Sequence, residues 1–364
     1  MNALHHRIAA IVRQDGPITI ERYWNIALFD PEAGYYTVRD PFGRGGDFTT
    51  APEISQMYGE LLGAWALSAW NALGRPSPFV FAEMGPGRGT MMADMLRVVL
   101  RVEPAFLKAA TITLIEASDR LARLQIDRLS RFDLPVRTAR RIDEVGEGPL
   151  VLLANELFDA VAIRQFVRMG RGWAERCVGL GEGGEGLAFA LLPLPPEAAA
   201  RLPDAPAGTL IEVAPARQAI AEAIGRRIAR FGGAGLFIDY GHDGGFGDTL
   251  QAVRSHGFVD PLERPGEADI TSHVDFRALA GAFRAGGALV SPLSTQGDLL
   301  LSLGLLERAG RLGSGRDASE QEAIRVAVRR LAGPGPGEMG TLFKAIAVAS
   351  GPLGVPPFPA AAPR

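Results

Sequence analysis

The segment Phe79-Val-Phe-Ala-Glu-Met-Gly-Pro-Gly-Arg-Gly-Thr90 decides the fold of this chain. A short apolar run is followed by an acidic residue, three alternating glycines and a sequence typical of a helix start. Because glycine lacks a Cβ atom, Gly85, Gly87 and Gly89 permit a tight turn and a close approach of the backbone to a ligand. A helix that begins near Thr90 would direct its free N–H groups at the same ligand. The segment therefore predicts a strand–turn–helix unit that binds a nucleotide.

Apolar runs and helical periodicity alternate along the rest of the chain. Alternation of this kind predicts βαβ units around a parallel sheet, and therefore an α/β fold. The expected strands are 79–84, 111–116, 150–154, 235–239 and 342–349. The expected helices are 3–14, 18–29, 53–73, 90–101, 119–131, 215–230, 274–285, 297–310 and 318–331.

The same patterns predict a domain organisation. Residues 1–75 are expected to form an N-terminal helical region with a long turn-rich loop, and residues 76–350 the core. Two inserts interrupt the core, an antiparallel β insert at 160–212 and an irregular one at 241–272. The Pro- and Ala-rich residues 351–364 are expected to be a disordered tail.

Composition excludes several classes of protein. The 38 basic and 41 acidic residues give a net charge of −3 without a long block of one sign, so a nucleic-acid partner is not expected. A single cysteine, Cys177, and five scattered histidines predict neither a disulfide framework nor a metal site. Membrane insertion is not expected, since no apolar run reaches roughly 18 residues. We expect a cytoplasmic protein, or a mitochondrial matrix protein in a eukaryote.

The spacing of the glycines indicates which nucleotide binds. A dinucleotide-binding turn reads G-x-G-x-x-G, whereas this turn reads G-x-G-x-G, with Glu83 two positions before its first glycine. A carboxylate there would repel phosphates and suits a cationic ligand. S-adenosyl-L-methionine carries a sulfonium and an ammonium group and no phosphate. The turn therefore favours S-adenosyl-L-methionine and disfavours an NAD-dependent oxidoreductase.

Polar residues follow three further strands, at the edge where open α/β sheets bind ligands. Glu116 ends the strand 111–116 where a ribose diol would lie, although it could also cap a helix or be solvated. Asn155 and Glu156 follow a buried run and are costly there unless hydrogen-bonded. Their alternative role is a helix N-cap and first turn. Asp239, after the next strand, is either functional or a turn residue.

Five motifs together make the chain resemble the MidA-type S-adenosyl-L-methionine-dependent methyltransferases. The most discriminating is Gly45-Gly-Asp-Phe-Thr-Thr-Ala-Pro-Glu-Ile-Ser-Gln56, and the resemblance runs from about Tyr23 to Ala347. The other motifs are Glu83–Thr90, Asn155–Ala160, Ile238–Gly241 and Ala268–Phe276. Ala51 and Ala154 depart slightly from the pattern of the family.

The resemblance implies a fold and a function. The fold would be a class I methyltransferase core, a seven-stranded Rossmann-like sheet with a reversed last strand, a helical N-terminal cover and the β insert. The function would be symmetric dimethylation of an arginine on a subunit of complex I (NADH:quinone oxidoreductase), in support of its assembly. The alternatives are a non-catalytic assembly factor that binds S-adenosyl-L-methionine, and a methyltransferase for another amine or cationic substrate. A homodimer stays open.

An arginine acceptor sets requirements for the catalytic residues. A carboxylate can accept two guanidinium N–H bonds and take up a proton. Glu156 is the first candidate, followed by Glu53 and Asp159, and His273 is a further candidate base. Glu53 could instead stabilise a helix start, and His273 could be a capping or packing residue.

The resemblance also implies the cofactor contacts. Arg88 could bind the cofactor carboxylate or lie exposed at the surface, and Asp47 could serve the cofactor, the substrate or a turn. Asp269 and Thr271 share the loop of His273 and could close over the substrate. The cofactor-binding set is Asp47, Phe48, Thr50, Pro52, Glu83, Gly85, Gly87, Arg88, Gly89, Glu116 and Asn155.

Overall fold

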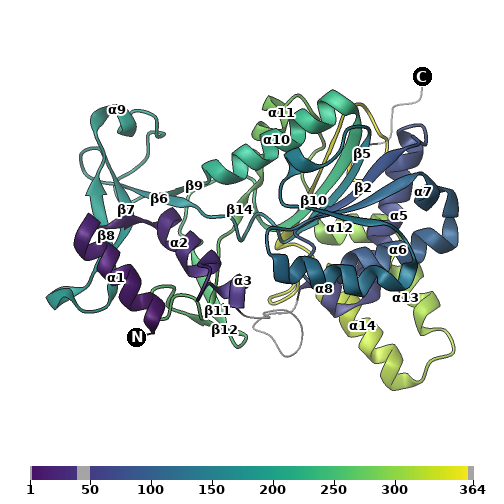
Figure 1. The fold of residues 1–364 in the computed structure, drawn as a ribbon, viewed down its shortest axis with the longest axis horizontal. Helices are drawn as coiled ribbons and strands as arrows, with labels where there is room; N and C mark the ends of the chain where they lie inside the picture. The colour runs from purple at the N-terminus through teal and green to yellow at the C-terminus, as the bar shows by residue number, and fades with distance from the viewer. Residues whose placement is uncertain (1, 39–49, 360–364) are drawn as a thin grey trace. The chain divides into compact units, whose positions relative to one another are not determined.

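The computed structural model describes residues 2–38 and 50–359 (Figure 1). The chain divides into two compact units. One, the insert unit, comprises Met1–Phe48, Phe158–Arg217 and Gly244–His273. The other, the core unit, comprises Thr49–Leu157, Gln218–Asp243 and Val274–Arg364. The expected division kept residues 1–75 together, whereas the structure assigns their last third to the core unit.

The core unit is built on one large sheet in the order β15-β17-β10-β5-β2-β3-β4. The strands β10, β5, β2, β3 and β4 run parallel, and β17 is antiparallel to β10 and to β15. The expected α/β sheet with a reversed last strand is thus confirmed. The bounds are β2 (Phe79–Met84), β3 (Ala110–Ile115), β4 (Val136–Ala139), β5 (Leu150–Asn155), β10 (Gly233–His242), β14 (Val274–Asp275), β15 (Leu289–Val290), β16 (Ser294–Thr295) and β17 (Phe343–Ala349). The short β14 and β16 pair with β10 and β17.

The register of the parallel strands brings their carboxyl ends to one edge. Met84 pairs with Ile115, Glu83 with Leu153, and Asn155 with Ile238. Every residue of β5 is buried, as expected for a parallel strand covered on both faces. The polar residues that follow these strands therefore gather at a single edge of the sheet.

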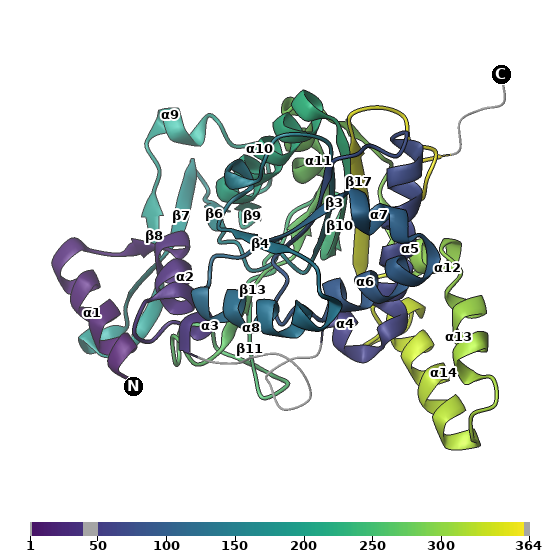
Figure 2. The ribbon, with the colours of Figure 1, turned by 45° about the vertical axis from the view of Figure 1, so that its right-hand side comes forward.

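Helices cover both faces of the sheet (Figures 1 and 2). On one face Phe283 of α11 packs against Phe237 of β10, with ring centroids 4.7 Å apart. On the other, Leu236 and Ile238 belong to the core cluster that contains α5 and α6. The helices are α4 (Ala51–Ile54), α5 (Gln56–Ala72), α6 (Thr90–Val102), α7 (Pro104–Ala109), α8 (Asp119–Leu129), η1 (Ser130–Phe132), η2 (Ile142–Glu144), α10 (Pro215–Phe231), α11 (Phe276–Ala285), α12 (Gln296–Ser302), α13 (Leu305–Gly313) and α14 (Ala318–Ala332).

Two expected helices are interrupted. The helix expected at 53–73 is divided into α4 and α5 at Ser55, whose backbone is extended and whose side chain accepts a bond from Met57 N–H. The helix expected at 297–310 is divided into α12 and α13 near Gly304, where φ is +89°. Helical periodicity continues across both breaks, because each pair of helices buries apolar residues in the same core.

The insert unit contains two antiparallel sheets. The larger one has the order β1-β7-β6-β9, with β8 also paired to β7, and includes the β insert expected at 160–212. The segment 241–272, expected to be irregular, instead forms the sheet β12-β11-β13. The bounds are α1 (Ala3–Asp15), β1 (Ile18–Thr19), α2 (Ile20–Phe29), α3 (Tyr35–Val38), β6 (Arg164–Arg168), β7 (Trp173–Leu180), η3 (Glu182–Gly184), β8 (Leu187–Pro193), α9 (Pro196–Ala199), β9 (Leu210–Val213), β11 (Gln251–Arg254), β12 (Gly257–Val259) and β13 (Asp269–Thr271).

The C-terminal segment corrects the expectation of a disordered tail. Leu353 and Val355 are buried in the core cluster, and Trp65 Nε1 donates a hydrogen bond to the carbonyl of Pro356. The segment 351–359 is therefore anchored to the core despite its composition, because apolar side chains between the prolines pack there. Residues 360–364 of the expected tail lie outside the described residues. In the part of the chain that the structure describes, no helix has the length and apolarity needed to cross a membrane.

Candidate functional site

The glycine turn joins β2 to α6 in the core unit. Gly85 N–H donates to the carbonyl of Ile115 over 3.0 Å, and φ is positive at Gly85 (+69°), Gly87 (+52°) and Gly89 (+73°). A Cβ atom on Gly85 would lie 2.9 Å from Leu157 Cδ1, so a side chain there would meet the segment after β5. The N-cap residue of α6 is Gly89, which has no side chain to bind the free N–H groups of the first turn. The turn is therefore a backbone cradle at the start of a helix, as the sequence predicted.

Glu83 is the acid that precedes the turn, and it is almost completely buried, with 2% of its surface exposed. Burial raises its pKa well above the usual range, while the N–H of Met92 opposes the shift by donating to the carboxylate. Its Oε2 atom has no hydrogen-bond partner among the described residues. A buried acceptor without a partner is costly, and a cationic donor would satisfy it.

Glu116 follows β3 and lies beside the turn. Its Oε1 accepts from Ser118 N–H (2.8 Å) and its Oε2 from Gln125 Nε2 (3.1 Å). Burial raises the pKa of Glu116, and these hydrogen bonds act in the opposite direction. Gln125 Nε2 also donates to the carbonyl of Gly87 over 2.8 Å. Gln125 on α8 thus links the carboxylate to the glycine turn.

Asn155 and Glu156 lie at the end of β5 and are connected by their side chains. Asn155 Nδ2 donates to Glu156 Oε1 over 2.9 Å, and the hydroxyl of Tyr58 donates to Asn155 Oδ1. The N–H of Ala51, at the start of α4, also points to Glu156 Oε1 at 3.4 Å. Glu156 has a φ of +49°, a conformation that non-glycine residues rarely adopt. Such strain is concentrated at functional sites.

Glu53 is brought to the start of α6. Its Oε1 accepts a hydrogen bond from Thr90 Oγ1 (2.6 Å), and that hydroxyl accepts one from Arg128 Nη1 (2.6 Å). The contact links α4, α6 and α8 at the glycine turn. It is compatible with both roles expected for Glu53, the functional one and the structural one.

The remaining core-unit candidates lie at the same edge of the sheet. Thr50 is the N-cap of α4 without a side-chain bond, and Pro52 lies in the first turn of that helix. Arg88 lies within the glycine turn, where its side chain is half-buried. Asp239 is 1% exposed, and its Oδ1 accepts from the N–H of Tyr240.

Two of the four catalytic candidates belong to the insert unit. Asp159 is buried, and its carbonyl accepts from Arg217 Nη2 (3.2 Å), which also donates to Ser272 Oγ (2.6 Å). Arg217 Nη1 donates to the carbonyl of His273 (2.8 Å), so one buried guanidinium joins the segments of both candidates. The expected catalytic set is therefore divided between the two units. Asp47 and Phe48 lie outside the described residues.

The other two candidates of the insert unit, Asp269 and Thr271, lie on β13. Both are buried, and Asp269 Oδ1 accepts from the hydroxyl of Tyr36 over 3.0 Å. The loop expected to carry them is therefore a strand of the smaller sheet, where ladder hydrogen bonds to β11 hold its backbone.

Sequence reasoning missed Gln125, Tyr58, Thr90 and Arg128. Gln125 had a signal, because it lies between Leu121 and Leu129 on one face of a helix, and all three are buried. A polar residue within a buried stripe indicates a specific hydrogen-bonding role. Tyr58 had no comparable signal, since a tyrosine fits an apolar stripe.

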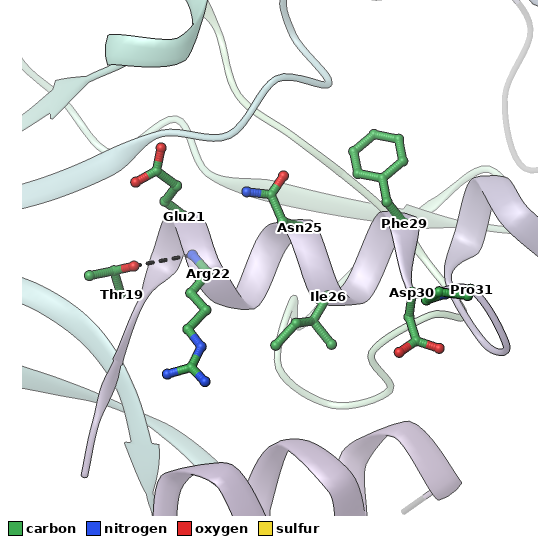
Figure 3. Close-up of a pocket in the computed structure, with 8 residues that line it drawn as sticks. All are labelled: Thr19, Glu21, Arg22, Asn25, Ile26, Phe29, Asp30 and Pro31. Carbon is green, nitrogen blue, oxygen red and sulfur yellow. Dashed lines mark hydrogen bonds between the residues drawn. The ribbon is translucent and has the colours of Figure 1, made fainter. Parts of the chain in front are cut away.

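A cavity of about 650 Å³ lies in the insert unit along α2 (Figure 3). Thr19 Oγ1, at the start of that helix, accepts from the N–H of Arg22. None of the site residues expected from the sequence lines it. The lining residues are Thr19, Glu21, Arg22, Asn25, Ile26, Phe29, Asp30 and Pro31.

Comparison with known proteins gives concordant results. A family model of S-adenosyl-L-methionine-dependent methyltransferases matches residues 61–292. The mitochondrial protein arginine methyltransferase NDUFAF7 of Mus musculus is 35% identical over 328 residues, which are 82% of this chain and 75% of that protein. The protein of the same name from Danio rerio is 35% identical over 334 residues, 86% of this chain and 79% of that protein.

Solved structures include a similar protein with a bound ligand. A COG1565 superfamily member from Burkholderia thailandensis, bound to S-adenosyl-homocysteine, has a TM-score of 0.83 and 32% sequence identity. The match covers 95% of this chain and 92% of that one.

Proposed function

Since this chain belongs to the family of S-adenosyl-L-methionine-dependent methyltransferases, we propose that it methylates an arginine side chain of a protein substrate. The arginine is supported by the names of the mouse and zebrafish relatives. In its narrower form, the proposal names a complex I subunit as the substrate and symmetric dimethylation as the outcome. This narrower form is supported by the resemblance of the sequence motifs to the MidA-type family. A mitochondrial location is supported by the names of the same relatives; a cytoplasmic location in a bacterium and a homodimer stay predictions.

The core-unit residues fit the cofactor. Bound S-adenosyl-L-methionine supplies an electrophilic methyl group and its own leaving group. The unpartnered Oε2 of buried Glu83 suits its ammonium group, and the cradle from Gly85 to Gly89 leaves the backbone open to a ligand. A carboxylate has about four acceptor positions, and the bonds from the N–H groups of Ser118 and Ala117 and from Gln125 leave one at Glu116 for a ribose hydroxyl.

The position of Glu156 is the observation that supports its role in binding the arginine that accepts the methyl group. It follows Asn155 at the edge where the glycine turn begins, and neighbouring Leu157 packs against Gly85. The side-chain bond from Asn155 and the positive φ fix the carboxylate in one place. Such a fixed carboxylate can orient a planar guanidinium by accepting its N–H bonds.

Glu156 is also the proposed proton acceptor. A guanidinium has a pKa above 12, so its reacting nitrogen must lose a proton at or after attack. A carboxylate within hydrogen-bond reach can take that proton. Glu53 remains a second candidate for this role at the glycine turn, and Asp159 and His273 remain candidates from the insert unit.

Glu156→Gln tests the proposal in the purified full-length chain. We expect S-adenosyl-homocysteine binding to stay within about twofold of the wild type, and methyl transfer to arginine to fall by roughly 100-fold or more. Glu338→Gln is the matched control, because Glu338 also accepts a main-chain N–H in the core unit but lies on the loop after α14. Mass spectrometry of arginine-containing complex I peptides, from cells with and without the gene, identifies the substrate.

The outcomes separate the parts of the proposal. Unchanged turnover in Glu156→Gln would remove Glu156 from the mechanism. Binding of S-adenosyl-homocysteine without arginine methylation would favour a non-catalytic assembly factor, or a methyltransferase for another cationic substrate.

A further inference from the structure

We propose that Gln125 is a positioning residue of the cofactor site, which holds the Glu116 carboxylate at a set distance from the glycine turn. The inference rests on the proposed function, because the ribose-binding role of Glu116 is part of it. Gln125 itself need not touch the cofactor. Its role would be to keep the Glu116 carboxylate in a fixed position relative to the backbone of the glycine turn.

The hydrogen bonds determine the orientation of the Gln125 side-chain amide. Nε2 has two N–H groups and two acceptors, the Gly87 carbonyl at 2.8 Å and Glu116 Oε2 at 3.1 Å. A reversed amide would direct its oxygen at two other oxygens, so only one orientation is compatible with these neighbours. Both N–H groups of the amide are therefore used to join the turn to the carboxylate.

The surroundings of Gln125 favour an apolar residue on packing grounds alone. Gln125 has no exposed surface and lies between Leu121 and Leu129 on the buried face of α8. Its Oε1 atom has no hydrogen-bond partner among the described residues, which is an additional cost. A buried amide whose oxygen has no hydrogen-bond partner costs stability. Such a residue is retained more readily when its nitrogen has a specific role.

Helix α8 also packs directly against the glycine turn. A Cβ atom on Gly89 would lie 3.5 Å from Gln125 Cα, which is van der Waals contact. The backbone of α8 therefore lies beside Gly89, while the side chain of Gln125 bonds to the carbonyl of Gly87. Loss of the amide would free Glu116 Oε2 and the Gly87 carbonyl, while the packing at Gly89 would remain.

The carboxylate of Glu116 is held at both oxygens. Ser118 N–H binds Oε1 and Gln125 binds Oε2, so rotation of the carboxylate would break both bonds. These two bonds, together with the Ala117 N–H and the charge of Arg120, oppose the rise in the pKa of Glu116 that burial causes. Glu83 is the acidic group that interacts with Glu116. Gln125 thus helps to keep Glu116 both oriented and ionised, and an ionised carboxylate is a pure acceptor, the form that suits a ribose hydroxyl best.

Isothermal titration of S-adenosyl-homocysteine into the full chain tests the proposal. We expect Gln125→Met to weaken binding roughly tenfold, the loss expected from one charge-assisted hydrogen bond. On acidification its affinity should also begin to fall at a higher pH than in the wild type, because the pKa of Glu116 rises when the Gln125 bond is lost. A merely structural role would not move that profile.

Gln296→Met is the matched control. Gln296 is another completely buried glutamine of the core unit, its Nε2 donates to the carbonyl of Leu331, and its Oε1 also lacks a partner among the described residues. We expect this variant to lose thermal stability and to keep the affinity and pH profile of the wild type. If Gln125→Met does not fold, Gln125→Glu has the same size and opposes Glu116 with a like charge, so its binding at neutral pH should be at least as weak.

Equal affinities and pH profiles for the Gln125→Met and Gln296→Met variants would overturn the inference while leaving the proposed function intact. Absence of binding in the wild type would instead overturn the cofactor part of the proposed function, and this inference with it.

Discussion

The hydroxyl of Tyr58 donates a hydrogen bond to Oδ1 of Asn155, so a residue on α5 orients the amide that in turn holds Glu156. Tyr58 is completely buried, and burial together with the charges of Glu156, Asp239 and Glu83 raises its pKa well above the ordinary value. The hydroxyl therefore stays protonated and remains a donor throughout the physiological pH range. Asn155 must accept through Oδ1, which leaves Nδ2 for the carboxylate.

Tyr58→Phe should lower kcat by roughly 10- to 100-fold, because a misplaced Glu156 carboxylate no longer meets the acceptor in its productive geometry. Affinity for S-adenosyl-homocysteine should stay within about twofold. Tyr23→Phe is the control, since Tyr23 is a buried tyrosine on α2 whose hydroxyl donates to the carbonyl of Pro261. Both variants should lose about 1–3 kcal/mol of stability, and only Tyr58→Phe should lose turnover. Equal kcat in the two variants would contradict the proposed arrangement.

Gly85→Ala should weaken S-adenosyl-homocysteine binding and lower stability by at least about 1 kcal/mol, the cost of a Cβ atom at positive φ. The new Cβ would lie 2.9 Å from Leu157 Cδ1, so the end of the Leu157 side chain, next to Glu156, would have to shift. Gly74→Ala is a matched control in the core unit, with a φ of +83° and no heavy atom within 4 Å of its new Cβ. It should show the conformational cost with unchanged affinity, measured by thermal unfolding and calorimetry. Parallel losses of affinity in both would show that the effect does not depend on Leu157.

Glu53 and Thr90 should be energetically coupled. Thr90 Oγ1 donates to Glu53 Oε1, so Glu53→Gln weakens the contact by removing the charge of the acceptor, and Thr90→Val removes the donor. A double-mutant cycle on the free energy of urea unfolding should give a coupling energy of about 0.5–3 kcal/mol. Additive effects would show that the contact adds nothing to stability. Turnover in the same variants distinguishes the two roles of Glu53, because a catalytic base would make Glu53→Gln far slower than Thr90→Val.

Asp94 on α6 should make stability fall as pH rises. Burial raises its pKa from 3.8 to about 6, although its ion pair with Arg97 opposes the shift. The folded state thus holds the proton more tightly than the unfolded state. Its contribution is fully present below pH 4 and is lost as the pH rises through about 6.

Asp94→Asn should remove this pH dependence. The free energy of unfolding of the variant minus that of the wild type should be larger at pH 8 than at pH 4. The increase should be at most about 3 kcal/mol, for a shift of about two pKa units. Loss of the Arg97 ion pair reduces the gain. Urea unfolding of both proteins at the two pH values measures it, and a difference in free energy that does not change with pH would contradict the assignment.

Local patterns were sufficient for most of the fold. Strands β2, β3, β5, β10 and β17 follow from apolar runs, because strands buried on both faces must be apolar throughout. The two-residue β15 and the exposed β4 lack that signal and were not anticipated. The breaks at Ser55 and Gly304 were also missed, since each pair of helices continues one apolar stripe.

The site could be predicted only in part. Strand-end acids such as Glu116 and Glu156 are visible in the sequence, because parallel strands bring their carboxyl ends to one edge of a sheet. Gln125 comes from the next helix, nine residues after Glu116, and only its hydrogen-bond partners were not visible. Tyr58 comes from a helix 97 residues before Asn155, and no spacing rule connects the two. Positive φ at Glu156 likewise has no local signature.

By itself, the sequence determined the glycine turn, the acids at the strand ends and the parallel strands β2, β3, β5 and β10, because those features depend on residues close together in the chain. Only the tertiary structure decided which residues hold the acids in place, that Glu53 is bonded to Thr90, and that Asp159 and His273 belong to a different unit from Glu156. Hydrogen bonds between side chains depend on helix packing, and packing brings together residues whose separation in the sequence carries no information about contact.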